Sequence, residues 1–224
     1  MKKILCLLFI TLSLSGFAQS RYQLFVDSLG IVVSDYIESH ASSGMDSAGF
    51  MQYFTQTAKN ITGSLDTLTA DQRRDLPALI IFRVLHHSNL VTAYLTNKVE
   101  GSKYWTHSDE MPASSISEAD LASFWTHKKF IYHDTDTSIV HLTLDQNFWI
   151  DSMADNTYSK LTVQKLNNQT FQSTFIKSNN KIKRLASIPG DIYHYQILEK
   201  SDHSYKVATH MNGISTYFIF ELEY

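Results

Sequence analysis

Residues 192–224 read IYHYQILEKSDHSYKVATHMNGISTYFIFELEY. Apolar and aromatic side chains recur at every second position in three runs of this stretch, which is the period of a strand with one buried face. Ser201-Asp202-His203 and Asn212-Gly213 separate the runs, and an Asn-Gly pair is the strongest short signal for a hairpin. Connections this short allow only antiparallel pairing, so we expect three consecutive antiparallel strands.

The same two-residue period extends back to about residue 130. Residues 139–144, 158–166 and 170–177 alternate, and Asn167-Asn168 predicts a two-residue hairpin turn. The whole region therefore predicts a meander of about seven or eight strands. Such a sheet must bury one face, and we expect a strongly curved sheet or a partial barrel packed on helices.

Residues 19–129 follow the helical period instead. One apolar stripe runs through residues 25–37 and a second through residues 50–61. A long apolar segment at residues 76–94 predicts a central buried helix. We therefore expect an N-terminal helical half of about four helices ahead of the antiparallel half.

Two short patterns mark where helices begin. Thr69 and Gln72 have the spacing of a capping box, and a further helix is expected to start at Ser117. The predicted fold class is α+β, with helices over 19–129 and strands over 130–224. No linker is evident near residue 130, so residues 19–224 are compatible with one compact domain.

The N-terminus has the pattern of a secretory signal peptide over residues 1–18. Lys2 and Lys3 precede an apolar run too short to cross a bilayer, and the small residues Gly16 and Ala18 follow it. The alternative is a buried N-terminal helix. We expect export to the periplasm or the exterior, with cleavage near Ala18.

Composition excludes several chemistries. Cleavage would remove Cys6, the single cysteine, so we expect no disulfide, thiolate metal site or cysteine nucleophile. The formal net charge is −3 and no basic face is evident, which argues against nucleic-acid binding. The local cluster Lys177, Lys181, Lys183 and Arg184 predicts a solvated hairpin tip. The glycine-rich nucleotide motifs are missing, and no cofactor is expected.

The densest group of imidazoles and carboxylates is His133, Asp134, Asp136 and His141. If two strands bring the histidines together, either aspartate would complete a zinc or iron site for hydrolysis. The alternative is a polar turn between strands. A metal-dependent hydrolase is therefore one functional hypothesis.

The aromatic residues of the last three strands support a different hypothesis. The residues that would line the concave face of the sheet are Tyr193, Tyr195, Tyr205, Phe218 and Phe220. An apolar concavity with several hydroxyls is the usual lining of a small-molecule pocket. The alternative is a plain core filled by helices.

The sequence leaves enzymatic activity open and favours binding without catalysis. We predict an exported protein that binds a small apolar or mixed ligand, or an envelope protein, through its strand half. Besides the hydrolase, one alternative is an interaction or inhibitor protein with an exposed apolar patch. Another is a small outer-membrane barrel, because apolar residues alternate up to the terminal Tyr224. The short strands and the long helical half argue against membrane association.

Overall fold

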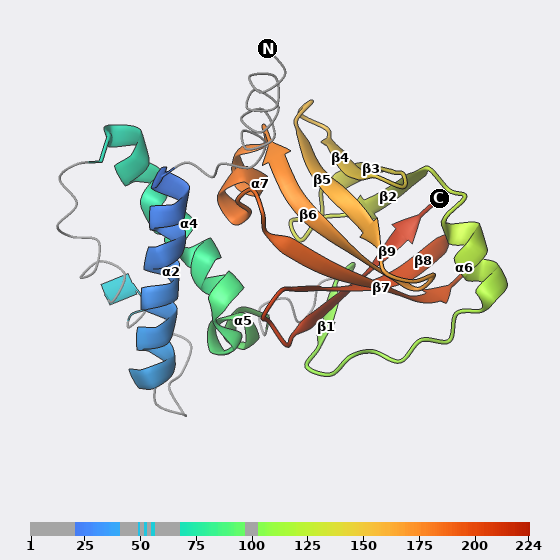
Figure 1. Cartoon of the computed structure of the whole chain (residues 1–224), viewed down its shortest axis with the longest axis horizontal. Helices are drawn as coiled ribbons and strands as arrows, with labels where there is room; N and C mark the ends of the chain where they lie inside the picture. The colour runs from blue at the N-terminus through green and yellow to red at the C-terminus, as the bar shows by residue number, and fades with distance from the viewer. Residues whose placement is uncertain (1–20, 41–48, 50–51, 53–54, 57–67, 97–102) are drawn as a thin grey trace, which may run out of the picture.

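The computed structural model describes residues 21–40, 49, 52, 55–56, 68–96 and 103–224. The predicted signal peptide and most of the predicted helix at residues 50–61 lie outside these residues. The described elements, in chain order, are α2 (Arg21–His40), α4 (Ala70–His87), α5 (Asn89–Thr96), β1 (Thr106–Ser108), α6 (Glu118–Phe124), β2 (Lys129–His133), β3 (Ile139–Leu144), β4 (Phe148–Met153), β5 (Tyr158–Lys165), β6 (Thr170–Ser178), α7 (Lys181–Ala186), β7 (Ile192–Lys200), β8 (Ser204–Met211) and β9 (Tyr217–Glu223). Helices come first and an antiparallel meander follows, which confirms the predicted α+β fold (Figure 1).

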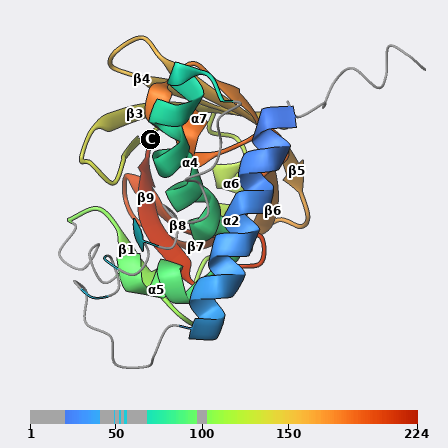
Figure 2. The ribbon, with the colours of Figure 1, turned by 90° about the vertical axis from the view of Figure 1, so that its left-hand side faces the viewer.

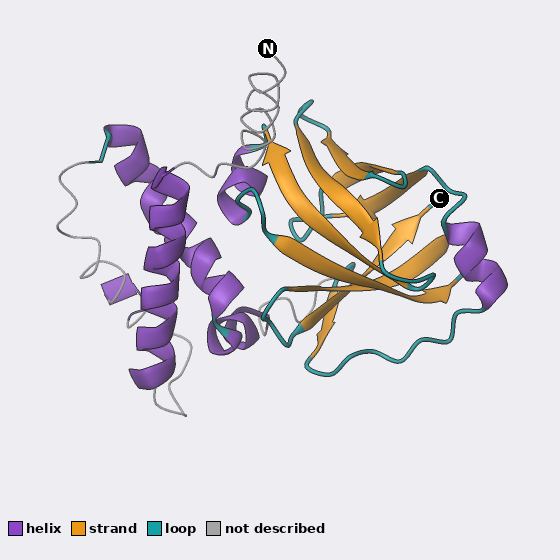
Figure 3. Ribbon diagram, viewed as in Figure 1, coloured by secondary structure: helices purple, strands orange, loops and turns teal. Residues whose placement is uncertain are grey.

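The meander closes into a barrel through its last strand. Each strand from β2 to β8 pairs antiparallel with the next one in the chain. β9 then pairs with residues 204–209 of β8 and meets β2 where Ile131 lies opposite Glu223. The short strand β1 joins β9, with Thr106 opposite Ile219. The predicted curved sheet is thus a closed eight-stranded barrel, β2 to β9, which leaves few unpaired strand edges (Figure 3).

α6 closes one end of the barrel. Its N-cap is the predicted Ser117, whose side chain accepts the backbone N–H of Asp120. Phe124 is fully buried, and its ring packs 5.3 Å from that of Phe130 and 5.0 Å from that of Tyr205, centroid to centroid. Burying one such ring contributes about 1.5–3 kcal/mol, so α6 acts as an aromatic plug.

Two connections differ from the sequence prediction. The loop between β5 and β6 covers residues 166–169 and not just two residues, because the Asn167 side chain accepts the N–H groups of both Gln169 and Thr170. The predicted hairpin tip after β6 is wrong, because the chain forms the helix α7 there. The Asn180 side chain caps this helix by accepting the N–H of Lys183.

α2 and α4 pack against each other beside the barrel end that carries α7 (Figure 2). Thr69 and Gln72 form the predicted capping box of α4. The predicted single helix at residues 76–94 is divided, because Ser88 has an extended backbone and separates α4 from α5. Leu185 of α7 joins the core between these helices, so α7 connects the helical part to the barrel. None of the described helices is both long and apolar enough to span a membrane.

Candidate functional site

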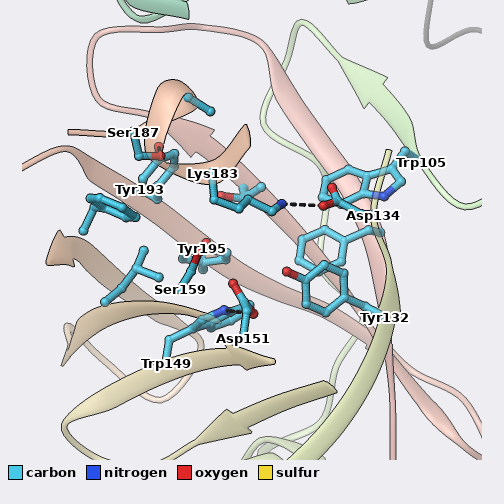
Figure 4. A pocket seen from close by; sticks show the side chains of 15 residues that line it. Trp105, Tyr132, Asp134, Trp149, Asp151, Ser159, Lys183, Ser187, Tyr193 and Tyr195 are labelled. Carbon is cyan, nitrogen blue, oxygen red and sulfur yellow. Dashed lines mark hydrogen bonds and ion pairs between the residues drawn. The ribbon is translucent and has the colours of Figure 1, made fainter. Parts of the chain in front are cut away.

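A cavity of about 220 Å³ lies inside the barrel at the end next to α7 (Figure 4). Aromatic residues are the largest group in its lining: Trp105, Tyr132, Trp149, Phe175, Tyr193, Tyr195 and Phe220. The inward-facing alternation of the strands places most of these rings, since β4 turns Trp149 and Asp151 toward the interior. At the opposite end of the barrel, Phe124 of α6 packs into the interior.

Asp151 is the buried charged group of this cavity, with only 6% of its surface exposed. The indole N–H of Trp149 donates to its Oδ1 at 2.7 Å. Burial raises the pKa of Asp151 to about 6, although the positive charge of Lys183 and hydrogen bonds from Trp149 and Tyr132 oppose that rise. A carboxylate accepts about four hydrogen bonds, so acceptor capacity beyond these two side chains remains for a ligand.

An ion pair also forms part of the cavity lining. Lys183 reaches from α7, and its Nζ lies 2.5 Å from Oδ2 of Asp134, which follows β2 (Figure 4). Both side chains are about three-quarters buried or more. The pair bridges α7 to the turn between β2 and β3, and it places two opposite charges in the lining of the cavity.

Neutral hydroxyls complete the lining. The hydroxyls of Ser187 and Tyr193 are hydrogen-bonded at 2.6 Å. Burial is the main cause that raises the pKa of Tyr193 and of Tyr195 far above the ordinary value, so both phenols stay protonated at physiological pH. The cavity therefore combines ring faces, hydrogen-bonding hydroxyls and one buried carboxylate.

Three of the five residues predicted to bind a ligand line this cavity: Tyr193, Tyr195 and Phe220. Tyr205 also points inward, but it lies at the plugged end, where it is fully buried against α6. Phe218 lies outside the cavity lining, on β9 between His107 and Thr209 of the neighbouring strands. The same inward face thus lines the cavity at one end, whereas Tyr205 belongs to the packed core beside α6.

Trp149, Asp151 and Lys183 line the cavity but were not among the predicted site residues. β4 carries the detectable signal, because Asp151 is a charged residue at an inward position of an alternating strand, two residues after a tryptophan. Burying a charged residue at an inward position costs free energy, because an isolated carboxylate loses its hydration there. Such a residue is therefore a signal of a candidate site. Lys183 was assigned to a hairpin tip, and the helix that directs it to the cavity went unrecognised.

The four residues of the hypothetical metal site do not converge. His133 and His141 both lie on the outer face of the barrel, and His141 pairs with Ile131 and not with His133. The His133 ring stacks on Tyr104 with centroids 3.7 Å apart. Asp134 pairs with Lys183, and the Asp136 carboxylate accepts hydrogen bonds from Ser138. Among the described parts of the chain, no three His, Cys, Asp or Glu side chains gather closely enough to hold a metal ion.

A second hollow, of about 290 Å³, lies beside α6 at the other end of the barrel. Its charged residues are engaged locally: Asp145 accepts the N–H groups of Asn147 and Phe148, and the ammonium of Lys165 lies over the ring of Trp125. This hollow has no buried charge that would orient a ligand, so the cavity beneath α7 is the stronger candidate. Comparisons with protein-family models, with curated proteins and with solved structures found no match.

Proposed function

We propose that this protein binds a small organic molecule in the barrel cavity and does not transform it. The observation that carries the proposal is a buried carboxylate, Asp151, facing a hollow with aromatic walls. An eight-stranded barrel is just wide enough either to be filled by side chains or to hold one small ligand. Here Phe124 and Tyr205 pack together next to α6, and the cavity with Asp151 lies at the end next to α7.

Small residues maintain the hollow. Ser159, Ala186 and Ser187 line it at positions where larger apolar side chains would fill the space. A core shaped only for stability is expected to be packed without voids and without a buried charge. The combination of small and charged residues therefore supports a binding role for this end.

The test is to fill the cavity from α7. Ala186→Trp places a bulky side chain in the cavity, whereas Ile182→Trp adds the same group at a position that is 60% exposed on the same helix. Calorimetric titration with a panel of small aromatic compounds should show binding to the wild type and to Ile182→Trp, and loss of binding in Ala186→Trp. Equal binding by all three proteins would contradict the proposal, as would binding to none.

Export is part of the proposal. The first described helix begins at Arg21, so cleavage near Ala18 would leave every described element intact. The intact mass of the protein recovered from the cell envelope or medium should lack residues 1–18. Recovery of the full-length chain from the cytosol would contradict this part of the proposal without affecting the cavity.

A further inference from the structure

We propose that the cavity selects a small organic cation, with an ammonium group at Asp151 and an apolar body of about one ring against the aromatic walls. This inference rests on the proposed function, because it names the chemical class of ligand for the same site. It follows from the charges in and around the cavity, the ring faces and the size of the hollow.

The charges of the lining leave one carboxylate uncompensated. Lys183 is the basic residue of the lining, and its ammonium is already paired with Asp134 at 2.5 Å. Asp151 lies deeper and receives neutral donors from Trp149 and Tyr132. The cavity therefore carries a net negative charge when Asp151 is ionised, which favours a cation and disfavours a carboxylate or phosphate ligand.

The neighbouring groups behind the cavity do not alter this balance. Arg83 lies behind Tyr193, but it is paired with Asp191 and Asp27. His86 packs edge-on against the Tyr193 ring, with centroids 6.0 Å apart. Burial lowers the pKa of His86 to about 4, so this imidazole is uncharged at neutral pH. Asp151 remains the charge that a ligand would meet.

The aromatic walls favour the same ligand. Tyr195 stacks on Trp149 with centroids 4.9 Å apart, and Trp105 stacks on Phe220 at 4.4 Å. The face of an aromatic ring carries partial negative charge and attracts ammonium groups, most strongly when the ring is tryptophan. Each stacked pair covers one face of each ring, and the faces left uncovered would offer apolar contact and electrostatic attraction to a cation.

The volume limits the body of the ligand. An apolar protein cavity of about 150 Å³ holds benzene. A hollow of about 220 Å³ therefore has room for one ring with a short chain. An aryl-alkyl amine is the simplest compound that meets both the charge and the size.

The experiment compares three probes of matched shape: phenethylamine, phenethyl alcohol and hydrocinnamate. Calorimetric titration at pH 7.5 should show that the wild type binds the amine at least about tenfold more tightly than the alcohol, and the anion most weakly. Asp151→Asn should weaken amine binding about tenfold or more and leave alcohol binding nearly unchanged. Asp136→Asn is the matched control, since it removes a carboxylate from the same end of the barrel without lining the cavity.

The outcomes distinguish a failure of the cation proposal from a failure of the proposed binding function. If the alcohol or the anion binds as tightly as the amine, the inference is wrong and the proposed function stands. The same holds if Asp151→Asn binds the amine unchanged. If no probe binds the wild type, both fail. If Asp151→Asn does not fold, as judged by near-UV circular dichroism, the ranking of the three probes on the wild type still tests whether the cavity prefers a cation.

Discussion

Arg83 and Asp191 meet in two parallel hydrogen bonds, 2.7 and 3.0 Å long, although they lie 108 residues apart in the chain. The guanidinium is only 3% exposed, and its Nε also donates to Asp27 of α2 at 2.7 Å. One buried cation therefore connects α2, α4 and the turn that leads into β7. This turn follows α7, so the same ion pairs support the helix that covers the cavity.

Arg83→Met should destabilise the protein strongly, because it leaves the carboxylates of Asp27 and Asp191 without their cation. Breaking a buried pair in this way costs about 3–5 kcal/mol. Arg74→Met is the matched control on the same helix, since the Arg74 side chain is 63% exposed and its ion pairs are at the surface. Urea unfolding should show a large loss for the first variant and no measurable change for the second. Similar losses for both would contradict a special role for Arg83.

Gly30 of α2 allows α2 to approach α4 closely. A Cβ at this position would overlap the Cβ of Arg83 and come within 3.2 Å of its backbone carbonyl carbon. Alanine favours a helix over glycine by about 1 kcal/mol, so without this contact Gly30→Ala would stabilise the protein. We expect the opposite sign, a loss of about 1–3 kcal/mol from overpacking. Ser28→Ala, at an exposed position of α2, should be nearly neutral in the same unfolding assay. A stabilising Gly30→Ala would show that the helices separate easily.

The order of the strands was predictable because it depends on local signals. Alternation in residues 192–224 and the Asn212-Gly213 turn dictate which strands are neighbours. Closure of the barrel was not predictable, because it depends on a contact between the two ends of the meander. There β9 meets β2, with Glu223 opposite Ile131. Nothing in either strand's own pattern distinguishes a closed barrel from an open curved sheet.

The cavity was only partly predictable for a similar reason. Tyr193 and Tyr205 both alternate inward and have the same chemistry, yet one faces the hollow and the other the plug. The difference comes from α6, whose Phe124 fills one end of the barrel. Alternation identifies the inner face, but it does not show which part of that face another element fills.

Asp151 and His86 should affect stability in opposite directions between pH 4 and 6.5. The pKa of Asp151 is raised from 3.8 to about 6, so its stabilisation is complete below pH 3.8 and is lost as the pH rises through about 6. The pKa of His86 is lowered from 6.5 to about 4, so its stabilisation is present above pH 6.5 and is lost as the pH falls toward 4. Each change corresponds to about 3 kcal/mol, and the two nearly cancel in the wild type.

Single variants should separate these two contributions. Asp151→Asn should lose about 3 kcal/mol of unfolding free energy between pH 6.5 and pH 4, because the His86 contribution is no longer offset by that of Asp151. His86→Gln keeps a donor for the carbonyl of Ala186 and should gain about the same amount over that range. Urea unfolding at several pH values measures both slopes. Slopes of the same sign would mean that one of these side chains is not buried in solution.

The affinity for a ligand should depend on pH through the ionisation of Asp151 if the cavity binds an ammonium group. The cation requires the ionised carboxylate, whose pKa in the unliganded protein is about 6. Phenethylamine affinity should therefore be constant well above pH 6 and fall about tenfold per pH unit below it. The amine itself stays protonated over this range, as a lysine side chain does. Phenethyl alcohol should show no such fall, nor should the residual amine binding of Asp151→Asn.

The Lys183–Asp134 pair lines the same cavity, and Asp134→Asn tests its influence on Asp151. The midpoint near pH 6 should move to lower pH, because a lysine freed from its partner favours the ionised form of Asp151. An amine affinity independent of pH from 7.5 to 5 would place the ammonium away from Asp151.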